Sequence, residues 1–116
     1  MGYTDFYHYT SQSGKNAIIA CGYIRENSTG GRHAHFGRGV YGTSLSPSSG
    51  KSTIASNNWK GHGRNYILSG SCDWAIKVRI PSDKVESVGP WNRDILVYRE
   101  QLNLKDFTYE TIEVPF

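Results

Sequence analysis

Residues 74–80 constrain the fold most, because a large apolar side chain occupies every second position. Trp74, Ile76, Val78 and Ile80 would lie on one face of an extended strand, and that face has to be buried against other parts of the chain. Aromatic and β-branched residues also dominate other short segments. We expect these to be strands as well: residues 3–10, 66–69, 95–99 and 107–114.

A short helix is predicted directly after the first strand. Ser11 or Ser13 is suited to cap its N-terminus, the helix runs to about Ala20, and Gly22 provides a left-handed stop. The side chains expected on its buried face are Ala17, Ile18 and Cys21.

A second helix is predicted from Pro47, which favours a first helical turn, through Ile54 towards Trp59. The remaining segments before residue 66 are short. They are a buried piece at residues 23–24, a polar loop at 27–35, a tight glycine-containing backbone with a strand around Val40 and Tyr41 at 36–43, and a loop at 60–65.

Two early helices followed by several strands predict an α+β fold. A chain of 116 residues is near the commonest domain size, so we expect residues 1–116 to form a single domain.

The longest apolar runs of the chain fall far short of the roughly 20 residues that cross a bilayer, and its first ten residues do not resemble a secretory signal. We therefore expect a cytoplasmic chain, and secretion or delivery as an effector stays open.

The two cysteines, Cys21 and Cys72, are too few for a disulfide framework or a closed zinc site. We interpret both as buried thiols, with a single bridge between them left open. His33 and His35 alternate as metal ligands would on a strand, but no nearby cysteine or acid completes a set, so a loop pair is favoured. His62, between two glycines, is also interpreted as a loop residue.

The charge distribution is asymmetric. No Asp or Glu occurs from Asn27 through Cys72, and that stretch carries five basic residues, while the rest of the chain has eight basic and ten acidic residues. A glycine-rich, basic segment without carboxylates suits a phosphate-bearing ligand. On charge alone, NAD, nucleic acid and a simple solvated face are equally good explanations.

Two phosphate-binding motifs are matched only in part. The run from Gly37 to Gly42 fits the G-x-G-x-x-G pattern, but that fingerprint needs a helix opening at the glycines and an acid about 20 residues later, and the next acid here is Asp73. Gly50-Lys51-Ser52 resembles the end of a Walker loop, yet Leu45 stands where its first glycine belongs. We reject both.

Three separated segments together resemble the ADP-ribosyltransferase superfamily, in particular its poly(ADP-ribose)-polymerase-like branch and the small HYD-signature transferases often found as toxin modules. They are Tyr7-His8-Tyr9-Thr10-Ser11, then Phe36-Gly37-Arg38-Gly39-Val40-Tyr41 continuing to Pro47, and Asn92-Arg93-Asp94-Ile95-Leu96-Val97-Tyr98. Their order and spacing agree with the family. The resemblance implies an ADP-ribosyltransferase-like split β-sheet core with a few short helices.

The resemblance also implies NAD as co-substrate. His8 would hold the adenosine-side ribose, which suits a neutral imidazole that both donates and accepts. The backbone of Tyr9, with the Thr10 hydroxyl beside it, would bind the nicotinamide amide, and Tyr41 would stack on the nicotinamide ring. The resemblance further places Phe36, Gly37 and Ser49 at the NAD site, with Ser49 beside the carboxamide.

Asp94 is implied as the catalytic acid, since a fixed carboxylate stabilises the oxocarbenium-like transition state of nicotinamide release. The polymerase branch has Glu there, and the shorter Asp, typical of the HYD-signature group, favours transfer of a single unit. Asn92 and Trp91 would contact the acceptor. Catalysis would then rest on Asp94, His8 and Tyr41, in a mono-ADP-ribosyltransferase acting on a macromolecule, by default a protein.

Other functions stay open. Water in place of the acceptor would make the chain an NAD glycohydrolase. A module that binds NAD, ADP-ribose or nucleic acid without chemistry is a third possibility, and nucleic acid is also an alternative acceptor: Trp59 would stack a base and nearby cations would follow phosphates, namely Arg32, Arg38, Lys60 and Arg64. Taken singly, each of His8, Tyr41 and Asp94 has an ordinary structural explanation, as a core histidine, a packed aromatic and a turn residue.

Overall fold

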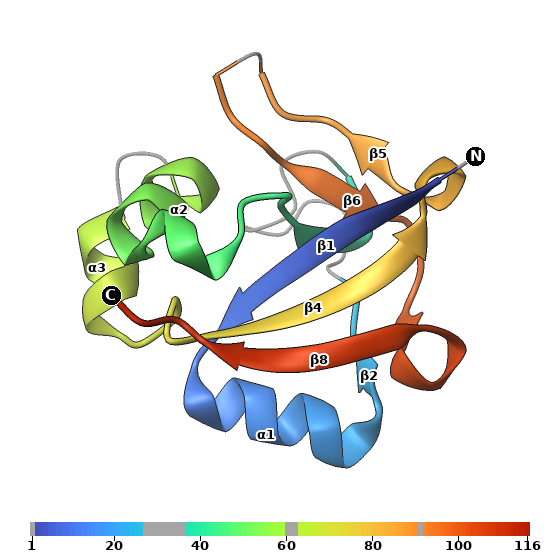
Figure 1. Cartoon of the computed structure of the whole chain (residues 1–116), viewed down its shortest axis with the longest axis horizontal. Coiled ribbons are helices and arrows are strands. Elements are labelled where there is room, and N and C mark those ends of the chain that lie inside the picture. Colours follow the sequence, from blue (N-terminus) through green and yellow to red (C-terminus); the bar gives the residue numbers. More distant parts are fainter. Residues whose placement is uncertain (1, 27–36, 60–62, 91) are drawn as a thin grey trace.

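A computed structural model of the chain describes residues 2–26, 37–59, 63–90 and 92–116. Within these residues, antiparallel strands form two three-stranded sheets and one two-stranded pair, ordered β1-β4-β8, β3-β6-β5 and β2-β7 (Figure 1). The strands are β1 (Tyr3–Thr10), β2 (Tyr23–Ile24), β3 (Val40–Gly42), β4 (Trp74–Pro81), β5 (Glu86–Ser87), β6 (Leu96–Tyr98), β7 (Leu102–Asn103) and β8 (Thr108–Glu113). The α+β prediction is confirmed.

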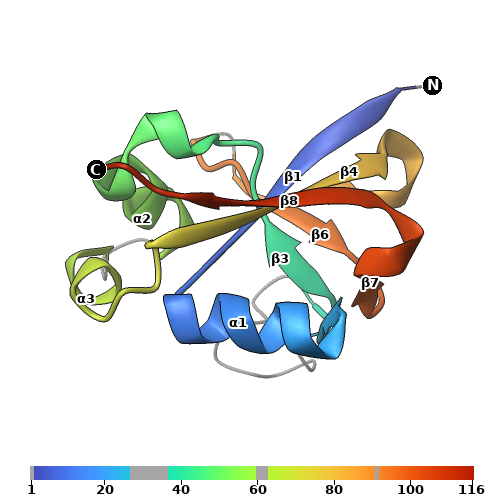
Figure 2. The same cartoon turned by 60° about the horizontal axis from the view of Figure 1, so that its bottom comes forward.

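The helices are short. They are α1 (Gln12–Cys21), α2 (Lys51–Asn58) and α3 (Gly63–Leu68), with the 3₁₀ turns η1 (Pro47–Ser49), η2 (Ser82–Lys84) and η3 (Leu104–Asp106). Helix α1 crosses one face of the β1-β4-β8 sheet, whereas α2 and α3 lie together near the C-terminus (Figure 2). No helix in the described part of the chain is long and apolar enough to cross a membrane.

Strand β4 is central to the first sheet, as its alternating sequence predicts. Ile76, Val78 and Ile80 are fully buried on one face and pack with Phe6 of β1, which pairs with Val78 in the register. On the opposite face, Tyr7 and Tyr9 belong to one apolar cluster with Ile54 and Ala55 of α2. Two apolar clusters, one on each face, therefore hold β1 in place.

The second sheet is joined to the first through β3. Tyr7 and Thr43 exchange two backbone hydrogen bonds, of 2.9 Å from the Tyr7 amide and 3.0 Å from the Thr43 amide. Gly42, one residue before Thr43, lies against the ring of Phe6, and a Cβ built there would approach the ring to 2.5 Å. The close approach of β3 to β1 thus requires a residue without a side chain.

Helix α1 begins and ends where the sequence predicts. The Ser11 hydroxyl caps it by accepting a 3.1 Å hydrogen bond from the Gly14 amide, and Gly22 ends it in the left-handed region with φ of 84°. Its expected buried face is wrong in part: Ile18 packs against the core, but Ala17 and Cys21 are exposed. Of these three side chains, Ile18 alone packs α1 against the core of the sheet.

The predictions for residues 47–69 need two corrections. Pro47 starts the 3₁₀ turn η1 and not the helix, because Gly50, with φ of 88°, separates η1 from α2. Residues 63–68, predicted as loop and strand, form helix α3, which packs against α2 by stacking Tyr66 on Trp59 at 4.3 Å between ring centroids. The loop predicted at 27–35 and residues 60–62 of the one predicted at 60–65 lie outside the described residues.

The two cysteines differ in environment. Cys72 is fully buried, as predicted, and burial raises the pKa of its thiol to about 11. Cys21 is exposed, so its predicted burial is wrong, and both thiols are free.

Gly42→Ala should destabilise the fold. The added Cβ would press on the Phe6 ring, and overpacking of this kind costs roughly 1–3 kcal/mol of unfolding free energy. Urea denaturation measures the loss. Gly2→Ala is the matched control, since a Cβ there meets nothing within 4 Å, and it should stay within about 0.5 kcal/mol of the parent. Equal stability of the two variants would contradict the close β1–β3 contact.

Candidate active site

Three strands bring the candidate residues together. Strand β1 carries His8, β3 carries Tyr41 and pairs with β6, and Asp94 lies two residues before β6 begins. Because β1 contacts β3 at the Tyr7–Thr43 bridge, segments separated by more than 30 residues in the sequence become neighbours.

His8 contacts Tyr41 directly. Its side chain is half-buried, and its Nδ1 lies 2.9 Å from the backbone carbonyl oxygen of Tyr41. A carbonyl only accepts, so Nδ1 carries the proton, and Nε2 of the neutral ring is left as the acceptor. Burial lowers the pKa of His8 from its usual value of 6.5, although the hydrogen bond to Tyr41 opposes this shift. His8 is therefore neutral at pH 7.

Tyr41 lies over the glycine-rich turn that precedes it. Its hydroxyl donates a 2.6 Å hydrogen bond to the Gly37 carbonyl, and Gly37 has a φ of 94° that favours glycine. Arg99 holds the same turn by donating from Nη1 to the Arg38 carbonyl at 3.0 Å, and it forms an ion pair with Glu86 at 2.9 Å. The half-buried Tyr41 ring is thus held by the turn and by the end of β6.

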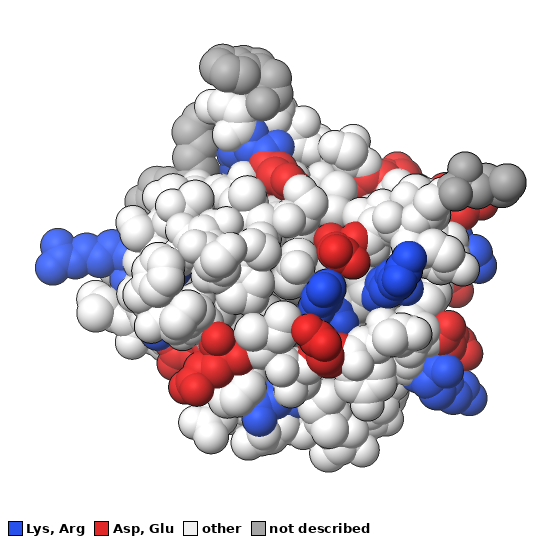
Figure 3. Space-filling model, viewed as in Figure 1, with Lys and Arg blue, Asp and Glu red and all other residues white. Residues whose placement is uncertain are grey.

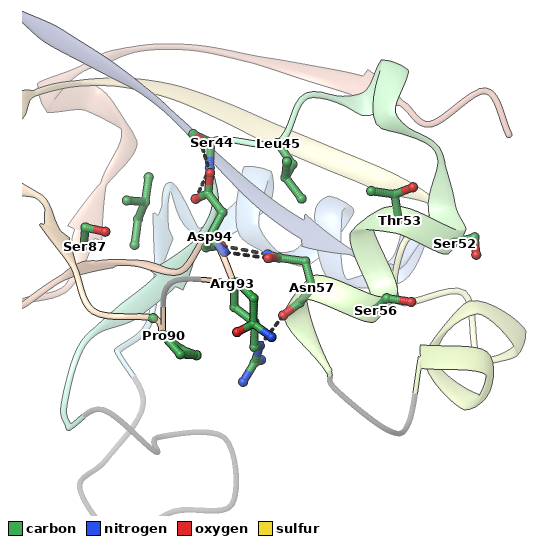
Figure 4. Close-up of a pocket in the computed structure, with 13 residues that line it drawn as sticks. Ser44, Leu45, Ser52, Thr53, Ser56, Asn57, Ser87, Pro90, Arg93 and Asp94 are labelled. Carbon is green, nitrogen blue, oxygen red and sulfur yellow. Dashed lines mark hydrogen bonds between the residues drawn. The ribbon is translucent and has the colours of Figure 1, made fainter.

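Asp94 is held at both its side chain and its backbone (Figure 4). The Ser44 amide donates to its Oδ1 at 3.0 Å, and the Ser44 hydroxyl donates to its Oδ2. The side-chain amide of Asn57 accepts from the Asp94 amide at 2.6 Å and donates to the Asp94 carbonyl at 2.7 Å. The position of this carboxylate is therefore defined from β3 and from α2.

Asp94 opens on a pocket of about 930 Å³, a size that suits a small-molecule ligand. The pocket lies between α2 and the segment that connects β5 to β6 (Figure 4). Hydroxyl and amide groups dominate its lining, which consists of Ser44, Leu45, Ser52, Thr53, Ser56, Asn57, Ser87, Gly89, Pro90, Asn92, Arg93, Asp94 and Leu96. Within the described chain the lining includes Asp94 and Asn92, but neither His8 nor Tyr41.

The structure therefore places the three candidate residues in two adjacent groups. His8 and Tyr41 are in contact, and Asp94 lines the pocket. Thr43 and Ser44 connect the two groups. The backbone of Thr43 is hydrogen-bonded to Tyr7, which precedes His8, and the next residue, Ser44, donates to the Asp94 carboxylate.

The backbone of Tyr9 points to the same side of β1 as β3. In an antiparallel strand the N–H and C=O groups of residues two apart point the same way. Since those of Tyr7 meet Thr43, those of Tyr9 are directed to that edge and away from β4. The Tyr9 phenol itself is buried and donates to the Leu45 carbonyl at 2.6 Å. The main-chain N–H and C=O groups of Tyr9 therefore do not pair with β4.

The other candidate residues are less closely grouped. The Thr10 hydroxyl lies against Gly14 of α1, where a Cβ would come within 2.2 Å of it, and Ser49 is half-buried at the end of η1. Asn92 is exposed at the pocket. Phe36 and Trp91 lie outside the described residues, as do His33, His35 and His62.

Two contacts bear on the alternative functions. Trp59, considered for stacking a base, stacks on Tyr66 in the fold, and Arg38, considered for phosphate binding, pairs with Glu26 at 2.8 Å. On the face seen in Figure 3, Lys and Arg side chains lie among Asp and Glu side chains. No group of three His, Cys, Asp or Glu side chains suited to a metal occurs among the described residues.

Sequence reasoning missed Asn57 and Arg93. Arg93 donates to the carbonyls of Asn57 and Asn58 at 2.7 and 3.0 Å, so it binds the C-terminal end of α2. Both residues act across more than 30 positions. Asn57 belongs to no segment that the resemblance drew on, and Arg93 lies within one, but its contact with α2 had no local signal. Ser44 lies within a segment that the resemblance drew on, but its hydroxyl offered no signal of its role.

The family comparison, taken with the α+β fold, defines the class of protein as an ADP-ribosyltransferase. Residues 6–70, more than half of the chain, match the family model Tox-ART-HYD1, described as HYD1 signature containing ADP-ribosyltransferase. The chain belongs to this family, whose model name marks it as a toxin-type group. His8 and Tyr41 lie within the matched range, and Asp94 lies beyond it. Searches of curated proteins and of solved structures found no match.

The lowered pKa of His8 predicts a loss of stability in acid. Above pH 6.5 both the folded and the unfolded state hold a neutral imidazole. Below pH 6.5 the His8 imidazole takes up a proton in the unfolded state but stays neutral in the folded state. The unfolding free energy therefore decreases as the pH is lowered from 6.5 to the pKa of His8 in the folded state. Urea denaturation of the parent and of His8→Gln, from about pH 7.5 to about pH 5, checks this. The parent should lose stability more steeply, and parallel curves would refute a neutral buried His8.

Proposed function

We propose that the chain is an NAD-dependent mono-ADP-ribosyltransferase that moves ADP-ribose from NAD to a macromolecular acceptor and releases nicotinamide. The observation that carries the proposal is the position of Asp94, which lines the pocket next to the strands of His8 and Tyr41. Membership of the ADP-ribosyltransferase family supports NAD as the co-substrate.

Asp94 is the acid that best completes a catalytic set of histidine, tyrosine and aspartate with His8 and Tyr41. The matched range contains no Asp, and its one Glu, Glu26, pairs with Arg38. Outside that range, Asp73 pairs with Lys51 at 3.0 Å. Asp94 is the one acidic residue among the described residues that line the 930 Å³ pocket.

The chemistry assigned to these residues follows from charge. Breaking the bond between nicotinamide and ribose builds positive charge on the ribose, and the Asp94 carboxylate stabilises that charge, orients the 2′-hydroxyl or takes the proton of the acceptor. Ser44 fixes the carboxylate for this purpose. Nicotinamide leaves with the electron pair of the broken bond, and the acceptor forms the new bond to the ribose.

The NAD contacts are assigned to the neighbouring group. His8 holds a ribose through its neutral ring, and the Tyr9 backbone binds the carboxamide at the β1 edge. Tyr41 stacks on the nicotinamide ring, and Phe36, Gly37, Thr10 and Ser49 complete the NAD contacts. The pocket lined by Asn92, together with Trp91, receives the acceptor, for which a protein is the first choice.

Asp94→Asn should abolish turnover with little effect on folding, because the side chain loses its charge but keeps an oxygen that accepts from the Ser44 amide, while its NH2 group donates to the Ser44 hydroxyl. Nicotinamide release from NAD should fall by roughly a hundredfold or more. Asp83→Asn, an exposed aspartate on η2, is the matched control and should behave as the parent. An Asp94→Asn variant that consumes NAD at the parent rate would overturn the catalytic assignment.

Mass spectrometry of the chain and candidate acceptors after exposure to NAD separates the possible functions. A mass increase of one ADP-ribose on an acceptor supports the proposal. Nicotinamide and free ADP-ribose without a modified acceptor indicate an NAD glycohydrolase. NAD that binds but stays intact indicates a module without chemistry.

A further inference from the structure

The side chain of Asn57 binds Asp94 in the way that a neighbouring strand would. It accepts from the Asp94 N–H and donates to the Asp94 C=O, at 2.6 and 2.7 Å, which reproduces the paired hydrogen bonds of an antiparallel ladder. Asp94 precedes β6, so the pairing of β3 with β6, which runs from Val40 to Gly42, does not include it. Asn57 supplies this pairing from a helix.

Asn57 is itself fixed. It is half-buried at the end of α2, and its amide nitrogen also donates to the Asn58 side chain at 2.9 Å and approaches the Thr43 hydroxyl at 3.4 Å. Its orientation therefore rests on the same buried Thr43 that joins β3 to β1.

Arg93 completes a reciprocal contact. While the Asn57 side chain binds the backbone of Asp94, the Arg93 guanidinium binds the backbone carbonyls of Asn57 and Asn58. These carbonyls end α2 and lack helical partners, and a charged donor bonds them strongly. Arg93, through its side chain, and Asp94, through its backbone, are therefore both hydrogen-bonded to the C-terminal end of α2 (Figure 4).

We propose that Asn57 is a positioning residue that aligns the Asp94 carboxylate for the transfer reaction. The inference rests on the proposed function, because it assigns Asn57 to the reaction of that site. Ser44 sets the direction of the carboxylate, and Asn57 sets the place of the peptide that carries it. A displacement of about 1 Å at a reacting group is able to cost roughly a hundredfold in rate.

The test uses Asn57→Ala, which removes both hydrogen bonds, and Asn57→Asp, which keeps the shape and the acceptor but lacks the donor to the Asp94 carbonyl. Asn16→Ala is the control, since this exposed asparagine lies on helix α1 and its side chain makes no hydrogen bond among the described residues. In both Asn57 variants, kcat for NAD consumption should fall roughly tenfold to a hundredfold, with the KM for NAD within about threefold of the parent.

Amide hydrogen exchange gives a readout that does not need activity. Exchange of the Asp94 amide should accelerate by about tenfold or more in Asn57→Ala, while the Val97 amide within β6 stays protected. The control Asn16→Ala should match the parent in both exchange and kcat. Asn57→Asp keeps the proposal testable if the alanine variant does not fold.

Two results would overturn the proposal. One is a kcat within about twofold of the parent in both Asn57 variants. The other is faster exchange throughout the sheet with equal losses in kcat and in NAD affinity, which is the signature of a merely structural residue. A parent chain that leaves NAD intact refutes the proposed function instead, and the exchange of the Asp94 amide then decides alone whether Asn57 anchors it.

Discussion

The paired backbone hydrogen bonds between Tyr7 and Thr43 are the contact on which the rest of the site depends. They join β1 to β3 and so connect the two larger sheets. Thr43 is fully buried, and its hydroxyl accepts from the Leu45 amide at 3.2 Å and faces Asn57. His8 follows Tyr7 in β1, and Ser44 follows Thr43 and donates a hydrogen bond to the carboxylate of Asp94. Both groups of the candidate site are therefore placed by Thr43 and Ser44, the two residues that directly follow β3.

Much of the first sheet could be predicted because its signals are local. Alternation defines β4, and a serine cap with a glycine stop defines α1. Helix α3 was missed because Tyr66 and Ile67 favour strands, whereas in the structure the stacking of Tyr66 on Trp59 and the packing of Ile67 at the core override that preference.

The candidate site was predictable only where a motif marks it. His8, Tyr41 and Asp94 were singled out through the family resemblance, and their catalytic roles stay predictions. The contacts that hold Asp94 had no such signal: Asn57 lies 37 residues away in sequence and Arg93 binds α2 across 36. An asparagine near the end of a helix is ordinary in sequence, and only the folded chain reveals that its amide pairs with a distant peptide. No sequence signal indicated that the candidate site is divided. Asp94 lines the pocket, whereas His8 and Tyr41 contact each other outside its lining.

The most direct measurement of the central claim is an NMR titration of the Asp94→Asn variant with NAD, following backbone amide shifts. This variant is expected to bind the dinucleotide without consuming it. We predict shifts that cluster at Tyr9, Tyr41 and Ser44, from both sides of the β1–β3 contact. Shifts confined to the hollow on the β1-β4-β8 sheet lined by Tyr3, Lys77 and Thr108, or no shifts at all, would contradict NAD binding at this contact.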